Sequence, residues 1–416
     1  MNNYLKSLGK NSNTAFNSKI NKKIKNKVLY KYASLIKKNK FKIINKNNKD
    51  IILATKKGLK KNLLDRLRLD NYKLDKIIKS IKTIAKLKDP IDVTLSKWKR
   101  PNGLVIKRVT IPIGIIGVIY ESRPNVTSDI SSLCFKSGNC VILKGGSEAY
   151  FSNKILSNYF RKSLKYYSID ENYVQFIESK NRKLVDLMLS NMEKYIDIII
   201  PRGGKNLVKK VQKLSSVPMI GHLQGICHTY IDKDANLNLA KKIVINAKLR
   251  NTSICGATET ILIHEKKLKK YVNPVLRQLV DNNCIIYADN KVKKIFKGKS
   301  KRATKKNWST EYLSAKVSVK SVKNVDEAIN HINKYGTMHT DAIISKNKKS
   351  AKFFLKNVKS SIAIHNSSTQ FADGGEFGFG GEVGISTNKL PPRGPVGLNQ
   401  LVTYKYEILG SGQIRS

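Results

Sequence analysis

The sequence is poor in cysteine, in acidic residues and in long apolar segments, and each shortage excludes a class of protein. Its 416 residues hold five scattered cysteines, Cys134, Cys140, Cys227, Cys255 and Cys284, with no Cys-x-x-Cys pair. Such a set argues against a disulfide framework or a zinc site and favours a reducing compartment. No apolar run approaches the length of a membrane span, and the N-terminus lacks the apolar core of a signal peptide. We therefore expect a cytoplasmic protein that does not bind membranes.

The shortage of acidic residues gives the chain an extreme charge. It has 29 Asp and Glu against 80 Lys and Arg, a formal net charge of +51. One interpretation is a nucleic-acid-binding protein that neutralises phosphates. However, the lysines are spread along the chain, and no helix-turn-helix, zinc-finger or RNA-binding signature accompanies them. We expect a solvated lysine-rich surface that binds no specific nucleic acid and whose field attracts anionic substrates.

Several ligand-binding signatures are also missing. The Gly-x4-Gly-Lys-Ser/Thr spacing of a Walker P-loop is absent. The dinucleotide fingerprint is absent too, because Val383 occupies the third glycine position after Gly378 and Gly380. The histidines include His222 and His228 but form no His-x3-His pair, so we expect no metal site.

Apolar spacing predicts helices over residues 1–95, followed by a hairpin with arms near 94–99 and 104–110 around the turn Asn102-Gly103. The chain then alternates between strand and helix, which indicates α/β structure with mostly parallel sheets. The first half of this region predicts strands at 115–120, 140–143 and 196–200, a loop at 123–126 and a helix over 127–137. The second half predicts strands at 229–232, 260–264, 284–287, 316–320, 341–345 and 362–366, with helices at 235–248, 325–334 and 349–357. The tail at 402–408 alternates like an exposed strand.

Two of the predicted strands end in glycine-rich turns that carry lysine. These turns are Lys144-Gly145-Gly146-Ser147 and Pro201-Arg202-Gly203-Gly204-Lys205. Backbone N–H groups and a cation at a helix start suit phosphate. For either turn alone, a simple tight turn is the better interpretation. Two of them in one sheet favour a ligand site, since ligands bind outside the carboxyl ends of parallel strands.

Cys255 lies in a polar loop between a predicted helix end and a predicted buried strand. Gly256 follows it and permits another group to approach closely. A thiol on such a loop is a candidate nucleophile if its surroundings favour the thiolate. The alternative is that Cys255 is a small apolar filler, which is the commoner role of a free cysteine.

Seven motifs, taken in order, closely resemble those of the γ-glutamyl phosphate reductase family, the proline-pathway branch of the aldehyde dehydrogenase superfamily. They are Arg123-Pro124-Asn125-Val126-Thr127, Lys144-Gly145-Gly146-Ser147, Ile200-Pro201-Arg202-Gly203-Gly204-Lys205, Gly225-Ile226-Cys227-His228, the Cys255 window, Phe371-Ala372-Asp373-Gly374-Gly375-Glu376-Phe377-Gly378 and Arg393-Gly394-Pro395. The resemblance runs over essentially the whole chain. It implies an aldehyde dehydrogenase-like fold of two doubly wound, mostly parallel-sheet domains and a β-arm for oligomerisation.

The resemblance also implies a division of labour along the chain. Residues 1–217 would form a cofactor-binding domain that carries the 94–110 hairpin arm, and residues 218–386 a catalytic domain. Residues 387–416 would return to the cofactor domain and end in the strand of the arm.

Residue roles follow from the same resemblance. Cys255 would be the nucleophile and Asn125 the oxyanion-hole amide. Lys144 would hold a cofactor ribose, with Ser147 beside it, and Glu311 would meet the ribose on the nicotinamide side. The turn Pro201-Arg202-Gly203-Gly204-Lys205 would face the cofactor phosphates. Arg123 and Arg250, which lie beside motifs, are candidate ligands of the substrate.

The implied reaction is the NADPH-dependent reduction of L-glutamate 5-phosphate to L-glutamate 5-semialdehyde and phosphate, through a cysteine thioester, in proline biosynthesis. Partners implied with it are a homo-oligomer and a functional link to glutamate 5-kinase. One departure is informative: hydrolytic aldehyde dehydrogenases carry a glutamate base in the segment that matches Leu223-Gln224-Gly225. Gln224 cannot deprotonate water, which argues against the alternative of an ordinary aldehyde dehydrogenase.

Overall fold

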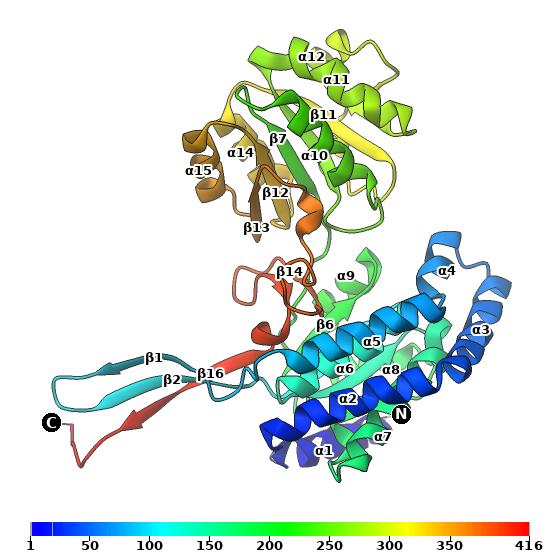
Figure 1. The fold of residues 1–416 in the computed structure, drawn as a ribbon, viewed down its shortest axis with the longest axis vertical. Coiled ribbons are helices and arrows are strands. Elements are labelled where there is room, and N and C mark those ends of the chain that lie inside the picture. The colour runs from blue at the N-terminus through cyan, green and yellow to red at the C-terminus, as the bar shows by residue number, and fades with distance from the viewer. Residues whose placement is uncertain (1, 19, 416) are drawn as a thin grey trace. The chain divides into compact units, whose positions relative to one another are not determined.

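The computed structural model of the chain describes residues 2–18 and 20–415, and these divide into two units. Unit 1 comprises the chain up to Gly221, the segment Gly378–Gly384 and the chain from Val396 onward. Unit 2 comprises His222–Phe377 and Ile385–Pro395. Each unit is built on a parallel sheet with helices packed on it (Figure 1), so the expected α/β class is confirmed.

The helices predicted for the front of unit 1 are present. They are α1 (Asn2–Asn17), α2 (Lys22–Lys38), α3 (Lys40–Lys56), α4 (Lys61–Leu67) and α5 (Asn71–Lys86). The start of α5 is capped by Asp70, whose carboxylate accepts a hydrogen bond from the Lys73 N–H. Residues three and four apart along α5, from Leu74 to Ala85, are buried, so its apolar face packs on the core of the unit.

The sheet of unit 1 has the strand order β5-β4-β3-β6, and every pair is parallel. Its strands are β3 (Ile115–Tyr120), β4 (Cys140–Gly145), β5 (Val174–Phe176) and β6 (Ile198–Arg202). Helices α6 (Pro124–Lys136), α7 (Tyr150–Tyr166), α8 (Lys183–Ser190) and α9 (Lys205–Leu214) connect or follow them. The chain leaves β3 toward β4 but returns to the other side of β3 as β6. The carboxyl ends of β3 and β6 therefore form a topological switch point, where open α/β sheets bind ligands.

Two predictions for unit 1 were wrong in their boundaries. The expected loop at 123–126 is largely helix, because α6 begins at Pro124. Proline is well suited to the first helical position, where its missing N–H leaves no bond unmade. The strand expected at 196–200 is β6 at 198–202, and it includes Pro201. Proline is tolerated there because β6 is the edge strand of the sheet.

A separate antiparallel sheet in unit 1 forms an arm, and it confirms the predicted hairpin and tail strand. Its strands are β1 (Thr94–Lys99), β2 (Val105–Pro112) and β16 (Val402–Leu409), in the order β1-β2-β16. In Figure 1 the three strands extend away from the helices of their own unit. Large apolar side chains are exposed along the arm: Leu95, Trp98, Tyr404, Tyr406, Ile408 and Leu409.

Unit 2 contains a seven-stranded sheet in the order β10-β9-β11-β8-β7-β12-β13. The strands are β7 (Cys227–Ile231), β8 (Thr258–His264), β9 (Ile285–Ala288), β10 (Lys301–Arg302), β11 (Lys316–Val322), β12 (Thr340–Ile344) and β13 (Ile362–His365). All pairs are parallel. Its helices are α10 (Leu237–Leu249), α11 (Leu268–Asp281), α12 (Asn290–Ile295), α13 (Lys305–Trp308), α14 (Val325–Tyr335) and α15 (Lys348–Asn357). The central strands β7, β8 and β12 are buried throughout, including the polar residues that they contain.

Two short strands, β14 (Gly384–Ser386) and β15 (Gly394–Val396), pair with each other. The glycine-rich residues 373–381 contain turns but no strand or helix. Among the described residues, no helix combines the length and apolarity that crossing a bilayer requires.

Candidate active site

The chemically active side chains of unit 2 gather at the amino-terminal edge of its sheet. Cys255 lies in the loop before β8, Glu311 in the loop before β11, and His339 directly before β12. His222 lies in the segment that leads into β7. These strands are neighbours in one parallel sheet, in the order β11-β8-β7-β12. Residues that precede each strand are therefore brought to the same edge.

The loop of Cys255 is held by close backbone contacts at two glycines, of which Gly225 leaves no room for a side chain. A Cβ at Gly225 would lie 2.1 Å from the Cys255 carbonyl oxygen, and one at Gly256 would lie 3.1 Å from the Thr369 carbonyl oxygen. The Cys227 thiol donates a hydrogen bond to the same Cys255 oxygen at 3.1 Å. The Cys255 side chain is half-buried against a small apolar cluster of Ile362, Ala372 and Ile385. Its sulfur is thus placed by packing on one side and by the loop backbone on the other.

Two histidines adjoin the Cys255 sulfur. The Cys255 Sγ and one ring nitrogen each of His222 and His339 all lie within 4.8 Å of one another. The two rings meet edge to face with centroids 4.8 Å apart. Burial alone raises the pKa of a thiol, but the positive charges of His339 and His222 outweigh burial and hold the pKa of Cys255 well below its ordinary value. The site therefore favours the thiolate.

Sequence reasoning missed the importance of His222 and His339. It considered His222 only as a possible metal ligand, and found no second histidine at the His-x3-His spacing. It did not single out His339. The two are brought together by the sheet, since β7 and β12 are paired although their sequences are far apart. A signal was available in the strand pattern: each histidine lies close before a predicted strand, as Cys255 does.

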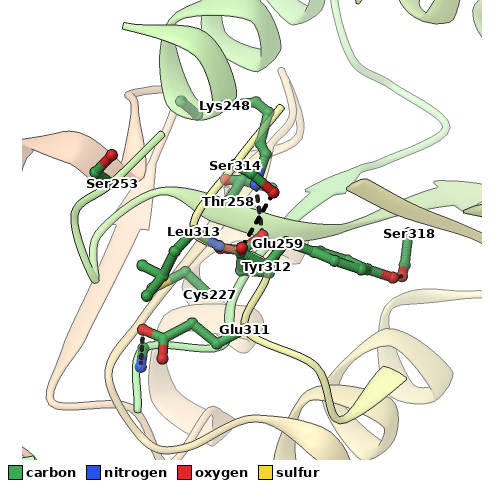
Figure 2. A network of polar contacts seen from close by, with 12 residues as sticks. Cys227, Lys248, Ser253, Thr258, Glu259, Glu311, Tyr312, Leu313, Ser314 and Ser318 are labelled. Atoms are coloured by element: carbon green, nitrogen blue, oxygen red, sulfur yellow. Dashed lines mark hydrogen bonds and ion pairs between the residues drawn. The ribbon is translucent and has the colours of Figure 1, made fainter. Parts of the chain in front are cut away.

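Glu311, the expected ligand of the nicotinamide-side ribose, lies near the Cys255 loop. Its Oε1 accepts a hydrogen bond of 2.8 Å from the Gly225 N–H. Figure 2 marks this bond by the dashed line at the Glu311 carboxylate. Burial raises the pKa of Glu311, the Gly225 N–H lowers it, and a Cys255 thiolate raises it further. The Glu311 carboxylate therefore lies near this loop. Gln224, which is half-buried beside Gly225, carries an amide and no carboxylate.

A buried ion pair fixes the segment that carries Glu311. Lys248 and Glu259 form a salt bridge, and both side chains are fully buried. The Glu259 Oε1 also accepts a hydrogen bond of 3.2 Å from the Leu313 N–H (Figure 2). Burial raises the pKa of Glu259 to about 7, against the lowering effect of Lys248. The pair ties α10 and β8 to the loop before β11, so it positions Glu311.

A cavity of about 340 Å³ in unit 2 contains Arg250, one of the two expected substrate ligands. Two cationic residues and one acidic residue line it: Lys242, Arg250 and Glu376. The rest of the lining is uncharged: Asn246, Asn366, Ser367, Ser368, Gln370, Ile243 and Phe371. The Arg250 Nε donates a hydrogen bond of 2.8 Å to Gln370 Oε1. Gln370 adjoins Thr369, whose carbonyl oxygen lies against Gly256. The cavity therefore shares its wall with the segment that supports the Cys255 loop.

The expected cofactor residues of unit 1 lie at the carboxyl ends of its strands, and several of them bond to other groups of the same unit. Lys144 is buried near the end of β4, and its Nζ donates to the Gly145 carbonyl oxygen at 3.1 Å. Burial lowers the pKa of Lys144, partly offset by Glu148. Ser147 is half-buried at the start of a short 3-10 turn that follows β4.

The second turn, at the end of β6, is partly occupied by a carboxylate of the protein itself. Pro201 and Arg202 are the last residues of β6, and Arg202 forms an ion pair with Glu382 at 3.1 Å. The exposed Gly204 N–H, at the start of α9, donates a hydrogen bond of 2.8 Å to Glu121 Oε2. Gly203 and Lys205 beside it are exposed. A phosphate bound at this helix start would replace Glu121.

Asn125 and Arg123 lie at the start of α6 in unit 1. Asn125 is exposed, and its Nδ2 donates to Asp129 Oδ2 at 3.1 Å. Arg123 is half-buried at the N-cap position. Cys255 belongs to unit 2, so a shared oxyanion hole with Asn125 stays a prediction.

Known proteins resemble the chain in both sequence and structure. A model of the aldehyde dehydrogenase family matches residues 10–283. The γ-glutamyl phosphate reductase of Bartonella quintana is 46% identical over 392 residues, which cover 94% of this chain and 95% of the relative. The crystal structure of γ-glutamyl phosphate reductase from Thermotoga maritima matches with a TM-score of 0.95 at 39% identity, and covers 99% of this chain and 100% of that one.

A more distant solved structure shows how widely the fold is shared. The acetylating aldehyde dehydrogenase of Geobacillus thermoglucosidasius matches with a TM-score of 0.70 at 14% identity, and covers 100% of this chain and 98% of that one. At that identity the match shows the fold alone. The expected aldehyde dehydrogenase-like fold is confirmed, and the chain belongs to the γ-glutamyl phosphate reductases of the aldehyde dehydrogenase family.

Proposed function

We propose that this chain reduces L-glutamate 5-phosphate to L-glutamate 5-semialdehyde and phosphate with NADPH, as a step of proline biosynthesis. One observation carries the proposal: in a chain 46% identical to a γ-glutamyl phosphate reductase, the half-buried Cys255 thiol adjoins the His222 and His339 rings. A thiolate held in this way attacks the acyl carbon of the substrate. The carbon–oxygen bond to phosphate breaks, phosphate leaves, and a γ-glutamyl thioester forms on Cys255.

Unit 1 offers groups that fit a nicotinamide dinucleotide. The exposed N–H groups of the turn after β6 and the cationic Lys144 lie at the carboxyl edge of one parallel sheet, near its switch point. We assign Lys144 and Ser147 to a ribose, the turn Pro201–Lys205 to the phosphates, and Glu311 of unit 2 to the nicotinamide-side ribose. Reduction of the thioester requires hydride, which is what a bound NADPH contributes.

The developing oxyanion needs hydrogen-bond donors. We assign this role to the Cys255 backbone N–H and the Asn125 side-chain amide. Asn125 uses one amide hydrogen toward Asp129 and retains a second for this purpose. Collapse of the thiohemiacetal then releases the aldehyde and restores the Cys255 sulfur.

The substrate is an amino acid with an anionic acyl phosphate, and the cavity of unit 2 has matching chemistry. Arg250 and Lys242 in its wall suit a carboxylate, and Glu376 suits an ammonium group. We therefore keep Arg250 as a substrate ligand that holds the α-amino-acid end. Arg123 of unit 1, at the start of α6, is assigned to an anionic oxygen of the phosphate.

The surroundings of Cys255 also bear on the fate of the thioester. Water attack would waste the intermediate, and Gln224 cannot act as its general base. Glu311 is the carboxylate near this loop, and its hydrogen bond to the Gly225 N–H occupies one of its oxygens. A site in which phosphate, and not water, exchanges with the thioester matches an acyl-phosphate reductase.

The arm supports a homo-oligomer. Its exposed apolar side chains, including Trp98 and Tyr406, lie on strands with a free sheet edge, which favours association through the arm. An acyl phosphate is labile in water, so we also propose a functional link to the glutamate 5-kinase that supplies it. A reactive free thiol suits the reducing cytoplasm, where we place the protein.

The test runs the reaction backwards with purified protein. Glutamate semialdehyde and NADP⁺ should give more than one NADPH per active site only when inorganic phosphate is present, because phosphate must discharge the thioester. Replacing phosphate with sulfate at equal ionic strength is the control. Phosphate-independent formation of NADPH together with glutamate would instead identify a hydrolytic aldehyde dehydrogenase.

A further inference from the structure

The Cys255, His222 and His339 side chains, which the proposed reaction uses to hold a thiolate, are also a set of three metal-ligating groups. One thiol sulfur and two imidazole nitrogens lie within 4.8 Å of one another, and all three residues belong to unit 2. We propose that Cys255, His222 and His339 form a binding site for Zn²⁺, and that zinc bound there reversibly inhibits the enzyme by occupying its nucleophile. The inhibition rests on the proposed function, whereas the binding of zinc does not.

The outer hydrogen bonds of both histidines are those of metal ligands. The His222 Nδ1 lies 2.7 Å from the Ile385 carbonyl oxygen, which can only accept, so Nδ1 carries the proton and Nε2 carries the lone pair. The His339 Nδ1 lies 2.9 Å from the Thr340 hydroxyl. A metal-bound histidine typically ties its other ring nitrogen to a carbonyl, carboxylate or hydroxyl, which fixes the ring orientation.

The His339 ring gives a second, independent sign of an unfilled site. It is fully buried, and its Nε2 has no hydrogen-bond partner among the described residues. A buried polar nitrogen without a partner carries a free-energy cost, which a ligand with an empty orbital would remove. In the tautomer whose Nδ1–H donates to the Thr340 hydroxyl, the lone pair of the neutral ring lies at Nε2 and is available for a metal.

The donor set and its dimensions suit zinc. Zn²⁺ prefers thiolate and imidazole ligands in a tetrahedron, with Zn–S near 2.3 Å and Zn–N near 2.0–2.1 Å. Those lengths place neighbouring ligand atoms about 3.4–3.6 Å apart. Side-chain movements of roughly 1 Å would bring the three ligand atoms from their present separations to those of a zinc site. Three protein ligands leave a fourth position for water, the pattern of an accessible zinc site.

Cys227 is a further thiol near this set, and its contacts keep it outside the donor set. Its Sγ lies 3.5 Å from His339 Nδ1 and donates to the Cys255 carbonyl oxygen. Binding of zinc forms bonds from the metal to the Cys255 sulfur and to one nitrogen of each ring, releases to solvent any proton that the thiol or these nitrogens held, and involves no redox change. The metal-bound sulfur no longer attacks an acyl phosphate.

The direct test measures zinc binding without substrate. Metal-free protein is titrated with Zn²⁺ against a competing colorimetric chelator, for wild type and for His222→Gln, His339→Gln and Cys255→Ser. We expect one zinc per chain in the wild type and affinity lowered at least about tenfold in each variant. His365→Gln, on an exposed histidine of β13, is the control and should bind like the wild type.

A measurement on the wild type alone guards against variants that fail to fold. Co²⁺ bound in place of zinc should give an intense thiolate-to-cobalt charge-transfer band, and prior alkylation of the protein with iodoacetamide should abolish both the band and tight zinc binding. The inference is overturned if alkylated protein binds zinc as tightly as unmodified protein, or if cobalt gives no thiolate band.

Inhibition is measured afterwards, in the phosphate-dependent reverse assay. Zinc should inhibit the wild type and the His365→Gln control alike, and a chelator should restore full activity. Zinc that binds as described but leaves turnover unchanged would refute the inhibitory role. If instead the protein shows no reductase activity, the proposed function fails while the binding result stands.

Discussion

The two units present their candidate ligand groups at opposite edges of their parallel sheets. In unit 1, Lys144 and the Pro201–Lys205 turn lie at the carboxyl ends of β4 and β6. In unit 2, Cys255 and His339 lie before the amino-terminal ends of β8 and β12. The carboxyl edge is the general ligand-binding edge of α/β sheets. The amino edge of unit 2 is the exception, because the candidate nucleophile Cys255 and its two histidines lie there.

The state of the side chains differs as much as their place. At the amino edge of unit 2, imidazoles surround the thiol and the buried Lys248–Glu259 pair positions the Glu311 segment. At the carboxyl edge of unit 1, Lys144 donates to its neighbour's carbonyl and Glu121 occupies the Gly204 N–H. If the proposed roles hold, the catalytic groups are arranged in advance, whereas the cofactor groups must exchange internal contacts for ligand contacts.

The largest effect should come from removing the nucleophile. Cys255→Ser should lower kcat at least about a thousandfold while leaving the thermal unfolding midpoint near that of the wild type, since a neutral hydroxyl is a far weaker nucleophile. The matched control is Cys284→Ala, on a buried cysteine whose pKa burial raises to about 11. Comparable losses in both variants would show that Cys255 is not the special thiol.

The next effect is on the pH dependence of Cys255. With its pKa depressed, the thiolate persists as the pH falls and is lost only below the folded-state pKa. His339→Gln removes the larger of the two cationic contributions, so alkylation by iodoacetamide at neutral pH should slow roughly 10–30-fold and its pH profile should move upward. Rates are measured with a chelator present, so that bound metal does not protect the thiol. An unchanged profile would mean that the histidine does not stabilise the thiolate.

On the cofactor side, Lys144→Ala should raise KM for NADPH about tenfold and lower kcat less, because the lysine binds far from the reacting carbon. Lys209→Ala, on an exposed lysine of α9, removes the same charge from the surface and is the control. Steady-state kinetics at saturating acyl substrate separate the two constants. If KM stays the same, Lys144 does not belong to the cofactor site.

The smallest effect concerns the carboxylate at the start of α9. If the turn after β6 faces the cofactor phosphates, Glu121→Gln should lower KM for NADPH about threefold, since an anion no longer competes for the helix N-terminus. Glu178→Gln, on a carboxylate paired with Lys154 at the surface, is the control. A KM that rises would instead indicate that Glu121 contacts the cofactor directly.

Much of the fold was predictable because apolar spacing depends on local sequence. The helical character of residues 1–95, the hairpin at Asn102-Gly103 and the strand at 115–120 follow from periodicity and turn chemistry. The start of α6 was predicted too late, because a proline such as Pro124 is common both in loops and at the first position of a helix. The predicted role of Cys255 came from its resemblance to a family, not from its loop alone.

The sequence did not indicate which residues that are far apart along the chain lie next to each other in the fold. His222 and His339 are neighbours only because β7 and β12 pair in the sheet, and no local pattern encodes that pairing. Likewise, Lys248 and Glu259 appear as ordinary charged residues until both prove fully buried. Glu121 at the Gly204 N–H is a tertiary contact of the same kind.

The central claim is that Cys255 carries the acyl group, and mass spectrometry of the protein tests it most directly. Wild-type protein is incubated with glutamate semialdehyde and NADP⁺ without phosphate, quenched in acid and digested. A γ-glutamyl adduct should appear on the Cys255 peptide and disappear when phosphate is added before the quench. An adduct on another residue, or turnover with phosphate while no adduct forms without it, would contradict the claim.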